Sequence, residues 1–228
     1  MHPDIQKLRN RFERGEPTLG VVFGTSISFG SQIDPASDPS IVYHKQWRDD
    51  LQSRFPNLEL TLDNQGVPGN KVIDALARIE ESAIKKNPEF IIVEFGINDC
   101  WDGPEKVEDF DQGLRRILSR LREETDSVLI VMTVNMLNHN VLPGALQLAW
   151  FAEKTADVQT LGWTEAYMNR VRELAPEFDL PLADGYAEWE AARERGTDTD
   201  LLLSNMANHP NKKGHRLLAD ALSKLFGL

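Results

Sequence analysis

The stretch VVFGTSISFG, residues 21–30, decides how the fold is read. Its apolar start is typical of a buried strand, and that pattern stops at Gly24-Thr25-Ser26. A tight turn into a helix, with Ser26 or Ser28 as the N-cap, is one explanation. The other is that Ser26 is a nucleophile held at the edge of a sheet. Three later segments of the chain bear on this choice.

Strand-like and helix-like patterns alternate along the chain. The strand-like segments are LGVVFG, LELTLDN, FIIVEFG, SVLIVMTVNM and a weaker DLPLAD. The helical patterns cover residues 39–55, 70–86, 105–124, 162–175 and 211–228. Five strands alternating with helices predict an α/β fold, with a parallel sheet covered on both faces. The length of 228 residues predicts one domain over residues 1–228.

The composition restricts the partners. The net charge of -11 disfavours nucleic acid and anionic membranes. One cysteine allows no intrachain disulfide, and the charged N-terminal residues contain no apolar signal-peptide core. No stretch is long and apolar enough to predict a membrane span. These features predict a cytoplasmic protein.

Residues 137–161 depart from the alternating pattern. They are longer than the usual connection of about 2–6 residues between strand and helix. They are also apolar, with Leu146, Leu148, Trp150 and Phe151 close together. Three interpretations stay open: an extra helix packed on the core, a lid over a substrate, or a self-association surface of a homo-oligomer.

Groups that can form hydrogen bonds follow the ends of the first three predicted strands: two polar side chains and the backbone N–H of a glycine. Ser26 follows the first strand, Gly69 lies in the loop after the second, and Asn98 follows the third. Ligands of open α/β sheets bind at the carboxyl ends of the strands, so these loops are expected to meet. His209 stands just before the last helix.

Acyl transfer to a serine needs these kinds of group. A serine hydroxyl becomes a nucleophile when a base takes its proton, and His209 can act as that base near neutral pH. The N–H groups of Ser26 and Gly69 and the side-chain amide of Asn98 can hold an oxyanion. Each residue alone is more simply a cap or a turn residue, but all four in this order favour catalysis.

The sequence resembles the SGNH, or GDSL, hydrolase family in four blocks. Residues 24–30 (GTSISFG) resemble the first block, and residues 64–70 (NQGVPGN) resemble the second. Residues 96–99 (GIND) match the third, and residues 209–215 (HPNKKGH) match the last. The resemblance implies a flavodoxin-like, three-layer αβα fold and serine catalysis on esters or thioesters. It implies no metal and no other cofactor.

Two positions depart from the family pattern. Thr25 stands where the family usually has an aspartate, and Met206 stands three residues before His209, where it usually has the acid that orients the histidine. A carboxylate from elsewhere, Asp200 or Asp184, is one replacement. A backbone carbonyl such as that of Met206 is the replacement we favour. The third alternative is a slow enzyme or a protein that has lost catalysis.

The sequence therefore predicts a serine-dependent ester hydrolase that acts on small acyl esters, O-acetylated carbohydrates among them, through an acyl-Ser26 intermediate. Trp101, directly after the GINDC turn (residues 96–100), is expected to contact the substrate. Activity is expected to rise with pH as His209 loses its proton, with a pKa of about 6–7. The alternatives are a binding module for carbohydrate or acyl groups without catalysis, and an acyltransferase.

Overall fold

The computed structural model describes residues 1–31, 41–143 and 149–228. In chain order its helices and strands are α1 (Pro3–Glu13), β1 (Thr18–Gly24), α2 (Ser26–Phe29), α3 (Tyr43–Arg54), β2 (Leu60–Gly66), α4 (Val72–Ser82), β3 (Phe90–Glu94), α5 (Val107–Glu124), β4 (Val128–Thr133), α6 (Ala149–Thr160), α7 (Trp163–Glu177), β5 (Leu182–Asp184), α8 (Gly185–Glu194) and α9 (Lys212–Leu225). The five predicted strands are all present, and the alternation of strands with helices is confirmed.

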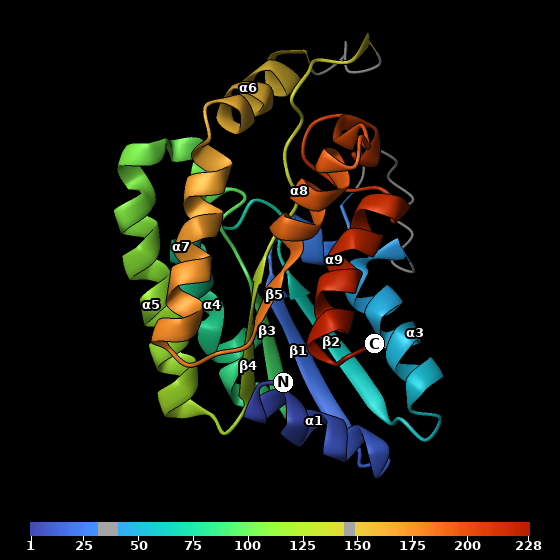
Figure 1. Cartoon of the computed structure of the whole chain (residues 1–228). Helices are drawn as coiled ribbons and strands as arrows, with labels where there is room; N and C mark the ends of the chain where they lie inside the picture. Colours follow the sequence, from blue (N-terminus) through green and yellow to red (C-terminus); the bar gives the residue numbers. More distant parts are fainter. Residues whose placement is uncertain (32–40, 144–148) are drawn as a thin grey trace.

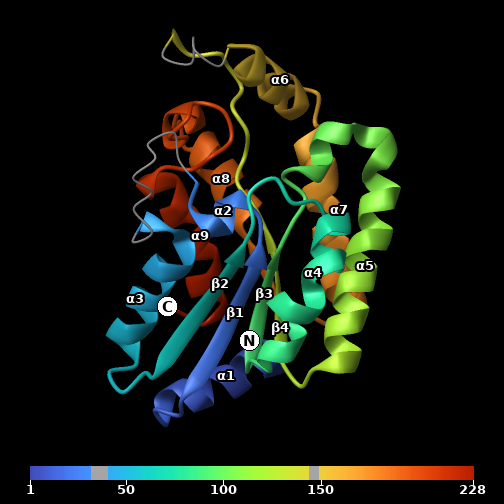
Figure 2. The ribbon, with the colours of Figure 1, turned by 180° about the vertical axis from the view of Figure 1, so that it is seen from behind.

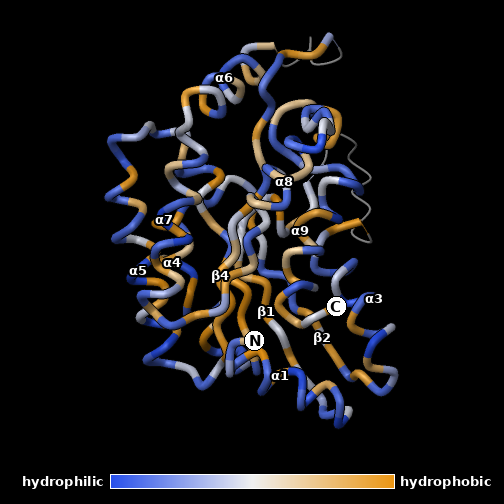
Figure 3. The backbone as a smooth tube through the Cα atoms, viewed as in Figure 1, coloured by the Kyte–Doolittle hydropathy of each residue, from blue (hydrophilic) through white to orange (hydrophobic). Residues whose placement is uncertain are grey.

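The strands form one parallel sheet in the order β2-β1-β3-β4-β5. Every residue of β3 and β4 is buried, which explains their continuous apolar runs. The edge strand β2 is half exposed and carries polar residues. Figure 3 shows the apolar strands gathered at the centre of the molecule.

Helices cover both faces of the sheet. Helices α4, α5 and α7 lie on one side of the sheet, and α3, α8 and α9 lie on the other (Figures 1 and 2). The helix predicted over residues 105–124 is α5, and its apolar stripe of Phe110, Leu114, Ile117 and Leu121 is buried against the core. The three-layer, flavodoxin-like αβα prediction is confirmed.

Two helices were not predicted from the sequence. Helix α1 buries Ile5, Leu8 and Phe12, a helical spacing that its many charged residues obscured. Phe12 stacks on Phe226 beyond the end of α9, with ring centroids 5.8 Å apart. Helix α8 begins directly after β5, and no loop sequence separates the two elements. Both helices cover apolar surface rather than form the site.

The carboxyl ends of the strands meet at one edge of the sheet, and α6 lies beyond that edge (Figure 1). The strand order reverses between β1 and β3, where open α/β sheets bind their ligands. Helix α6 comes from the segment 137–161. Leu146 and Leu148 of that segment lie outside the described residues.

Candidate active site

Ser26 is the first residue of the short helix α2, directly after β1. Thr25 is the N-cap, and its hydroxyl accepts a hydrogen bond from the N–H of Ile27 at 3.3 Å. The cap turns the chain sharply at the end of the strand. Ser26 is only 3% exposed, but it lines a surface cleft.

Glu94, at the end of β3, lies buried beneath this turn. Its carboxylate accepts hydrogen bonds from the N–H (3.1 Å) and hydroxyl (2.9 Å) of Thr25. It also accepts from the N–H (3.3 Å) and hydroxyl (2.6 Å) of Ser28. Burial raises the pKa of Glu94 to about 7, against the lowering effect of these bonds. Sequence reasoning missed Glu94, although a glutamate that ends an apolar strand was a usable signal.

Arg78 of α4 is a second residue that the sequence did not single out. Its guanidinium donates to the carbonyls of Gly24 and Gln65, each at 2.9 Å, and to Oδ1 of Asn70 at 2.6 Å. It also lies over the ring of Phe23, 4.5 Å from the centroid. Arg78 thus joins the ends of β1 and β2 to the glycine loop that follows β2.

His209 lies in a tight loop before α9. Leu203 and Pro210 form an antiparallel bridge, and the N–H of Ser204 donates to the carbonyl of His209 at 2.7 Å. This loop brings the imidazole to the serine, so that Nε2 of His209 is 3.1 Å from Oγ of Ser26.

The segment after β4 holds the histidine loop in place through two hydrogen bonds. The side chain of Asn135 donates to the carbonyl of Asn208 at 2.9 Å, and the N–H of Asn138 donates to the carbonyl of Ala207 at 2.9 Å. Both asparagine side chains are fully buried. The position of the imidazole therefore depends on contacts between distant parts of the chain.

Among the described residues, neither of the two aspartates proposed from the sequence makes a hydrogen bond to the His209 ring. Asp200 accepts hydrogen bonds from the N–H groups of His139 (2.7 Å) and Asn140 (2.9 Å), and so ties down the loop after β4. Asp184 caps α8 through the N–H of Ala187 and pairs with Arg172 at 2.8 Å. Both carboxylates are already committed to these structural contacts.

The group at Nδ1 of His209 is the side-chain amide of Asn205, with its nitrogen 3.2 Å away. The carbonyl of Met206, which we favoured from the sequence, is not the contact that the structure gives this nitrogen. Met206 instead has a left-handed backbone with a φ of 56°. This conformation turns the chain between Asn205 and His209.

Ser26, Gly69, Asn98 and His209 line one cleft of about 560 Å³. The amide of Asn98 donates to the carbonyl of Asn70 at 2.8 Å, which holds the side chain in place. Gly69 has a φ of 78°, and a Cβ built there would meet no atom within 4 Å. The glycine is therefore needed for its backbone conformation. A side chain at this position would project into open space.

Two aromatic residues form part of the cleft wall. Trp101, in the 3₁₀ turn after the GIND motif, lies with its ring centroid 5.0 Å from that of Phe151 of α6. Both residues line the cleft beside Ser26 and His209. Helix α6 thus contributes to the same cleft as the turns at the sheet edge.

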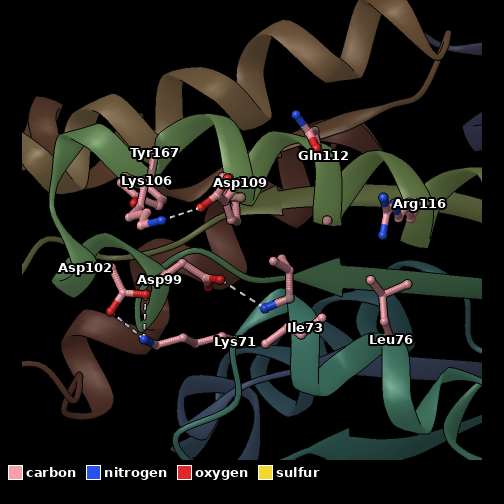
Figure 4. A pocket seen from close by; sticks show the side chains of 13 residues that line it. Lys71, Ile73, Leu76, Asp99, Asp102, Lys106, Asp109, Gln112, Arg116 and Tyr167 are labelled. Atoms are coloured by element: carbon pink, nitrogen blue, oxygen red, sulfur yellow. Dashed lines mark hydrogen bonds and ion pairs between the residues drawn. The ribbon is translucent and has the colours of Figure 1, made fainter.

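A second cavity of about 380 Å³ lies on the far side of an ion pair. Lys71 and Asp102 line both spaces, and the lysine nitrogen lies 2.6 Å from the carboxylate (Figure 4). The second cavity continues between α4 and α5 toward Leu76 and Arg116 (Figure 4). Asp99 lines it while accepting the N–H of Val72 at 3.0 Å, and burial raises the pKa of Asp99 to about 6.

Burial lowers the pKa of His209 to about 4. A buried imidazole loses the hydration that stabilises its charged form. His209 is therefore neutral through the physiological range and can accept a proton there. The change in activity with pH, expected from the sequence at pH 6–7 for a solvated histidine, is therefore now expected at about pH 4.

Comparison with known proteins gives consistent relatives. The model of the GDSL-like lipase/acylhydrolase family matches residues 22–217. An acetylxylan esterase of Geobacillus stearothermophilus is 24% identical over 179 residues, which cover 78% of this chain and 77% of that protein. The uncharacterized lipoprotein YqeF of Bacillus subtilis (strain 168) is 24% identical over 218 residues, 89% of this chain and 86% of that protein.

Solved structures share the fold. The crystal structure of Axe2, an acetylxylan esterase from Geobacillus stearothermophilus, has a TM-score of 0.71 at 22% identity and covers 92% of this chain and 94% of its own. LAE5, an alpha/beta hydrolase enzyme from the metagenome of Lake Arreo, has a TM-score of 0.71 at 21% identity and covers 92% of this chain and 95% of its own.

The cytoplasmic location predicted from the sequence is wrong. The finding that overturns it is the relative from Bacillus subtilis, which is a lipoprotein. Acidic composition and a single cysteine say little about compartment, since targeting and lipid attachment decide it. Within the described ranges, no helix is long and apolar enough to cross a membrane.

The family model spans most of the chain, the fold is that of the solved relatives, and the motifs that carry the resemblance line one cleft. The chain belongs to the GDSL-like lipase/acylhydrolase family and is a carboxylic ester hydrolase.

Proposed function

We propose that this chain hydrolyses small acyl esters of carbohydrates through an acyl-Ser26 intermediate. The observation that carries the proposal is the distance of 3.1 Å between Nε2 of His209 and Oγ of Ser26. A nucleophile and a base within hydrogen-bond reach, in a cleft with oxyanion donors, form the arrangement that acyl transfer requires.

The reaction runs in two steps. Oγ of Ser26 attacks the ester carbonyl carbon while its proton passes to Nε2 of His209. The N–H groups of Ser26 and Gly69 and the amide of Asn98 hold the oxyanion. The intermediate then expels the alcohol, which takes the proton from His209. Water attacks the acyl-enzyme in the same way, its proton passing to His209, and the acid is released as Ser26 regains its proton.

Two observations support a carbohydrate ester. Trp101 and Phe151 offer an aromatic wall beside the reactive groups, a surface on which sugar rings stack. A relative with 24% identity is an acetylxylan esterase. The cleft volume of about 560 Å³ accommodates a small acyl group with part of a sugar chain.

Turnover of p-nitrophenyl acetate by Ser26→Ala tests the nucleophile. We expect kcat to fall by about 10⁴-fold or more, because the acyl-enzyme cannot form. Covalent labelling by a fluorophosphonate is expected to disappear as well. Ser53→Ala, an exposed serine of α3, is the matched control and keeps both signals. Equal rates for Ser26→Ala and the unaltered protein would remove Ser26 from the mechanism.

Acetate release from acetylated xylo-oligosaccharides tests the substrate class. We expect Trp101→Ala to raise KM for these substrates more than for p-nitrophenyl acetate, because the small aryl ester depends less on the aromatic wall. Turnover of p-nitrophenyl acetate without any acetate release from the oligosaccharides would contradict the carbohydrate assignment and leave the serine mechanism intact.

A further inference from the structure

The orientation of the Asn205 amide is set by the backbone around it. Its Oδ1 accepts hydrogen bonds from the N–H groups of Ala207 (3.2 Å), Asn208 (3.0 Å) and His209 (3.0 Å). An amide oxygen is the acceptor of this side chain, and its nitrogen can only donate. Turning the amide over would place its N–H groups against three N–H donors in a buried loop, so this orientation is fixed.

The amide nitrogen therefore faces the imidazole as a donor. Nδ2 of Asn205 lies 2.6 Å from Oδ1 of Asn208 and 3.2 Å from Nδ1 of His209. For Nδ1 to pair with an N–H donor, it must be the unprotonated nitrogen of the ring. The proton of the neutral ring then sits on Nε2 and points at Oγ of Ser26.

We propose that Asn205 is a positioning residue that holds neutral His209 in the tautomer protonated at Nε2, and that this limits the rate of the esterase. The proposal rests on the serine mechanism above. In this tautomer Nε2 has no lone pair to accept the proton of Ser26. The base forms only when the ring carries its proton on Nδ1, where it faces the N–H of Asn205.

The charged ring is disfavoured as well. When His209 takes the proton of Ser26, both ring nitrogens become donors, and Nδ1–H again faces the N–H of Asn205. In a Ser-His-Asp triad the carboxylate accepts this bond and stabilises the imidazolium, and changing that acid to its amide costs about 10⁴-fold in kcat. This chain carries the amide in the equivalent place, supplied one residue earlier than Met206.

The loop can accept the acid. In Asn205→Asp, one carboxylate oxygen replaces Oδ1 and keeps the three backbone N–H groups. The other replaces Nδ2 and accepts the Nδ1–H of His209. Asn208 must then turn its amide to donate instead of accept, a change that needs only a rotation of its own side chain.

The first test measures p-nitrophenyl acetate hydrolysis by Asn205→Asp. We expect kcat to rise by about 10²-fold or more. This is a part of the ~10⁴-fold by which an orienting acid raises kcat over its amide in a Ser-His-Asp triad. The acid limb of the kcat/KM profile should move up from about pH 4, because a carboxylate at Nδ1 stabilises the imidazolium. Asn57→Asp adds the same charge at an exposed position before β2 and is expected to leave kcat unchanged.

The second test reads the tautomer directly in the unaltered protein. In ¹⁵N-labelled protein near pH 7, two-bond ¹⁵N–¹H correlations of His209 should show the proton on Nε2, and in Asn205→Asp they should show it on Nδ1. A ring protonated at Nδ1 in the unaltered protein overturns the proposal, even if Asn205→Asp does not fold. So does a folded Asn205→Asp variant with unchanged kcat and pH profile. Retained activity in Ser26→Ala would instead refute the serine mechanism and leave the tautomer measurement standing.

Discussion

Glu94, at the end of β3, supports the turn that carries Ser26 although it lies far from that turn in the sequence. Its carboxylate gathers the N–H and hydroxyl groups of Thr25 and Ser28, on either side of Ser26. Thr25 stands where the family pattern has an acid, and the structure provides a carboxylate from the neighbouring strand instead. The turn thus receives its carboxyl acceptor from β3 rather than from its own sequence.

Glu94→Gln is expected to destabilise the protein. A glutamine brings N–H donors to a site where four donors converge, and each unsatisfied buried group costs about 1–3 kcal/mol. We expect a lower free energy of unfolding in urea and a lower kcat, because the turn carrying Ser26 loosens. Glu59→Gln, at an exposed position before β2, is the control. An unchanged unfolding midpoint for Glu94→Gln would show that the carboxylate does not hold the turn.

Asn98→Ala tests the proposed oxyanion donor. Removing one such donor typically costs about 10²–10³-fold in kcat, or about 2.7–4 kcal/mol in the transition state. KM should change little, because the bond strengthens only as charge develops on the oxygen. Steady-state kinetics with p-nitrophenyl acetate gives both values. Asn57→Ala, an exposed asparagine before β2, is the matched control; a rise in KM alone for Asn98→Ala would indicate a ground-state binding role.

Helix α6 is the element whose role the sequence left open. It buries Ala152 and Val158 against the protein, as an extra packed helix does, and it also brings Phe151 to the cleft. Trp150 and Leu161 are exposed, at 69% and 64%. The self-association surface and the oligomeric state stay predictions, and light scattering of the purified protein measures them.

Phe151→Ala is expected to raise KM for acetylated oligosaccharides several-fold, with a smaller effect on kcat. The mutation removes half of the aromatic wall but leaves Ser26 and His209 in place. Leu161→Ala changes an exposed residue after the same helix and serves as the control. If both variants behave alike on the oligosaccharides, α6 is a structural helix and not part of the substrate site.

Over the whole molecule, three histidines couple stability to pH: His44 and His215 are buried and His209 is half-buried. Burial lowers the pKa of His44 and of His209 to about 4, and that of His215 to about 3. The unfolded chain binds protons at these rings below about pH 6.5, whereas the folded chain does not. Their contribution to stability is therefore complete above about pH 6.5 and is lost as the pH falls toward 4.

His215→Phe isolates one of these contributions. His215 stacks on Tyr43, which a phenylalanine ring can still do, and both of its ring nitrogens lack a partner among the described residues. Between pH 6 and 4, the free energy of unfolding of the variant should fall less steeply than that of the unaltered protein. The difference in slope should be about 1.4 kcal/mol per pH unit, the value for one proton that only the unfolded chain binds. Urea unfolding at several pH values measures the slope. Parallel curves for the variant and the unaltered protein would contradict a neutral, buried His215.

The architecture was predictable because it depends on local patterns. Apolar runs in β1, β3 and β4 and the stripe of α5 each record burial in the sequence itself, and chain order then sets a parallel sheet. Helices α1 and α8 were not predicted. Charged residues obscured the apolar periodicity of α1, and α8 begins directly after β5 without a separating loop. The convergence of Ser26, Gly69 and Asn98 followed from their places after successive strands.

The sequence by itself determined the α/β fold, the loops that form the cleft and the residue types available for acyl transfer, since these follow from periodicity and chain order. Only the tertiary structure decided that Glu94 and Arg78 support the turns, that Asp184 and Asp200 serve elsewhere, and that Asn205 faces Nδ1 of His209. Those outcomes depend on where each donor and acceptor lies in the folded chain and on which partner it faces. Hydrogen-bond direction in such a loop is set by contacts between residues far apart in the chain, and no local pattern encodes it.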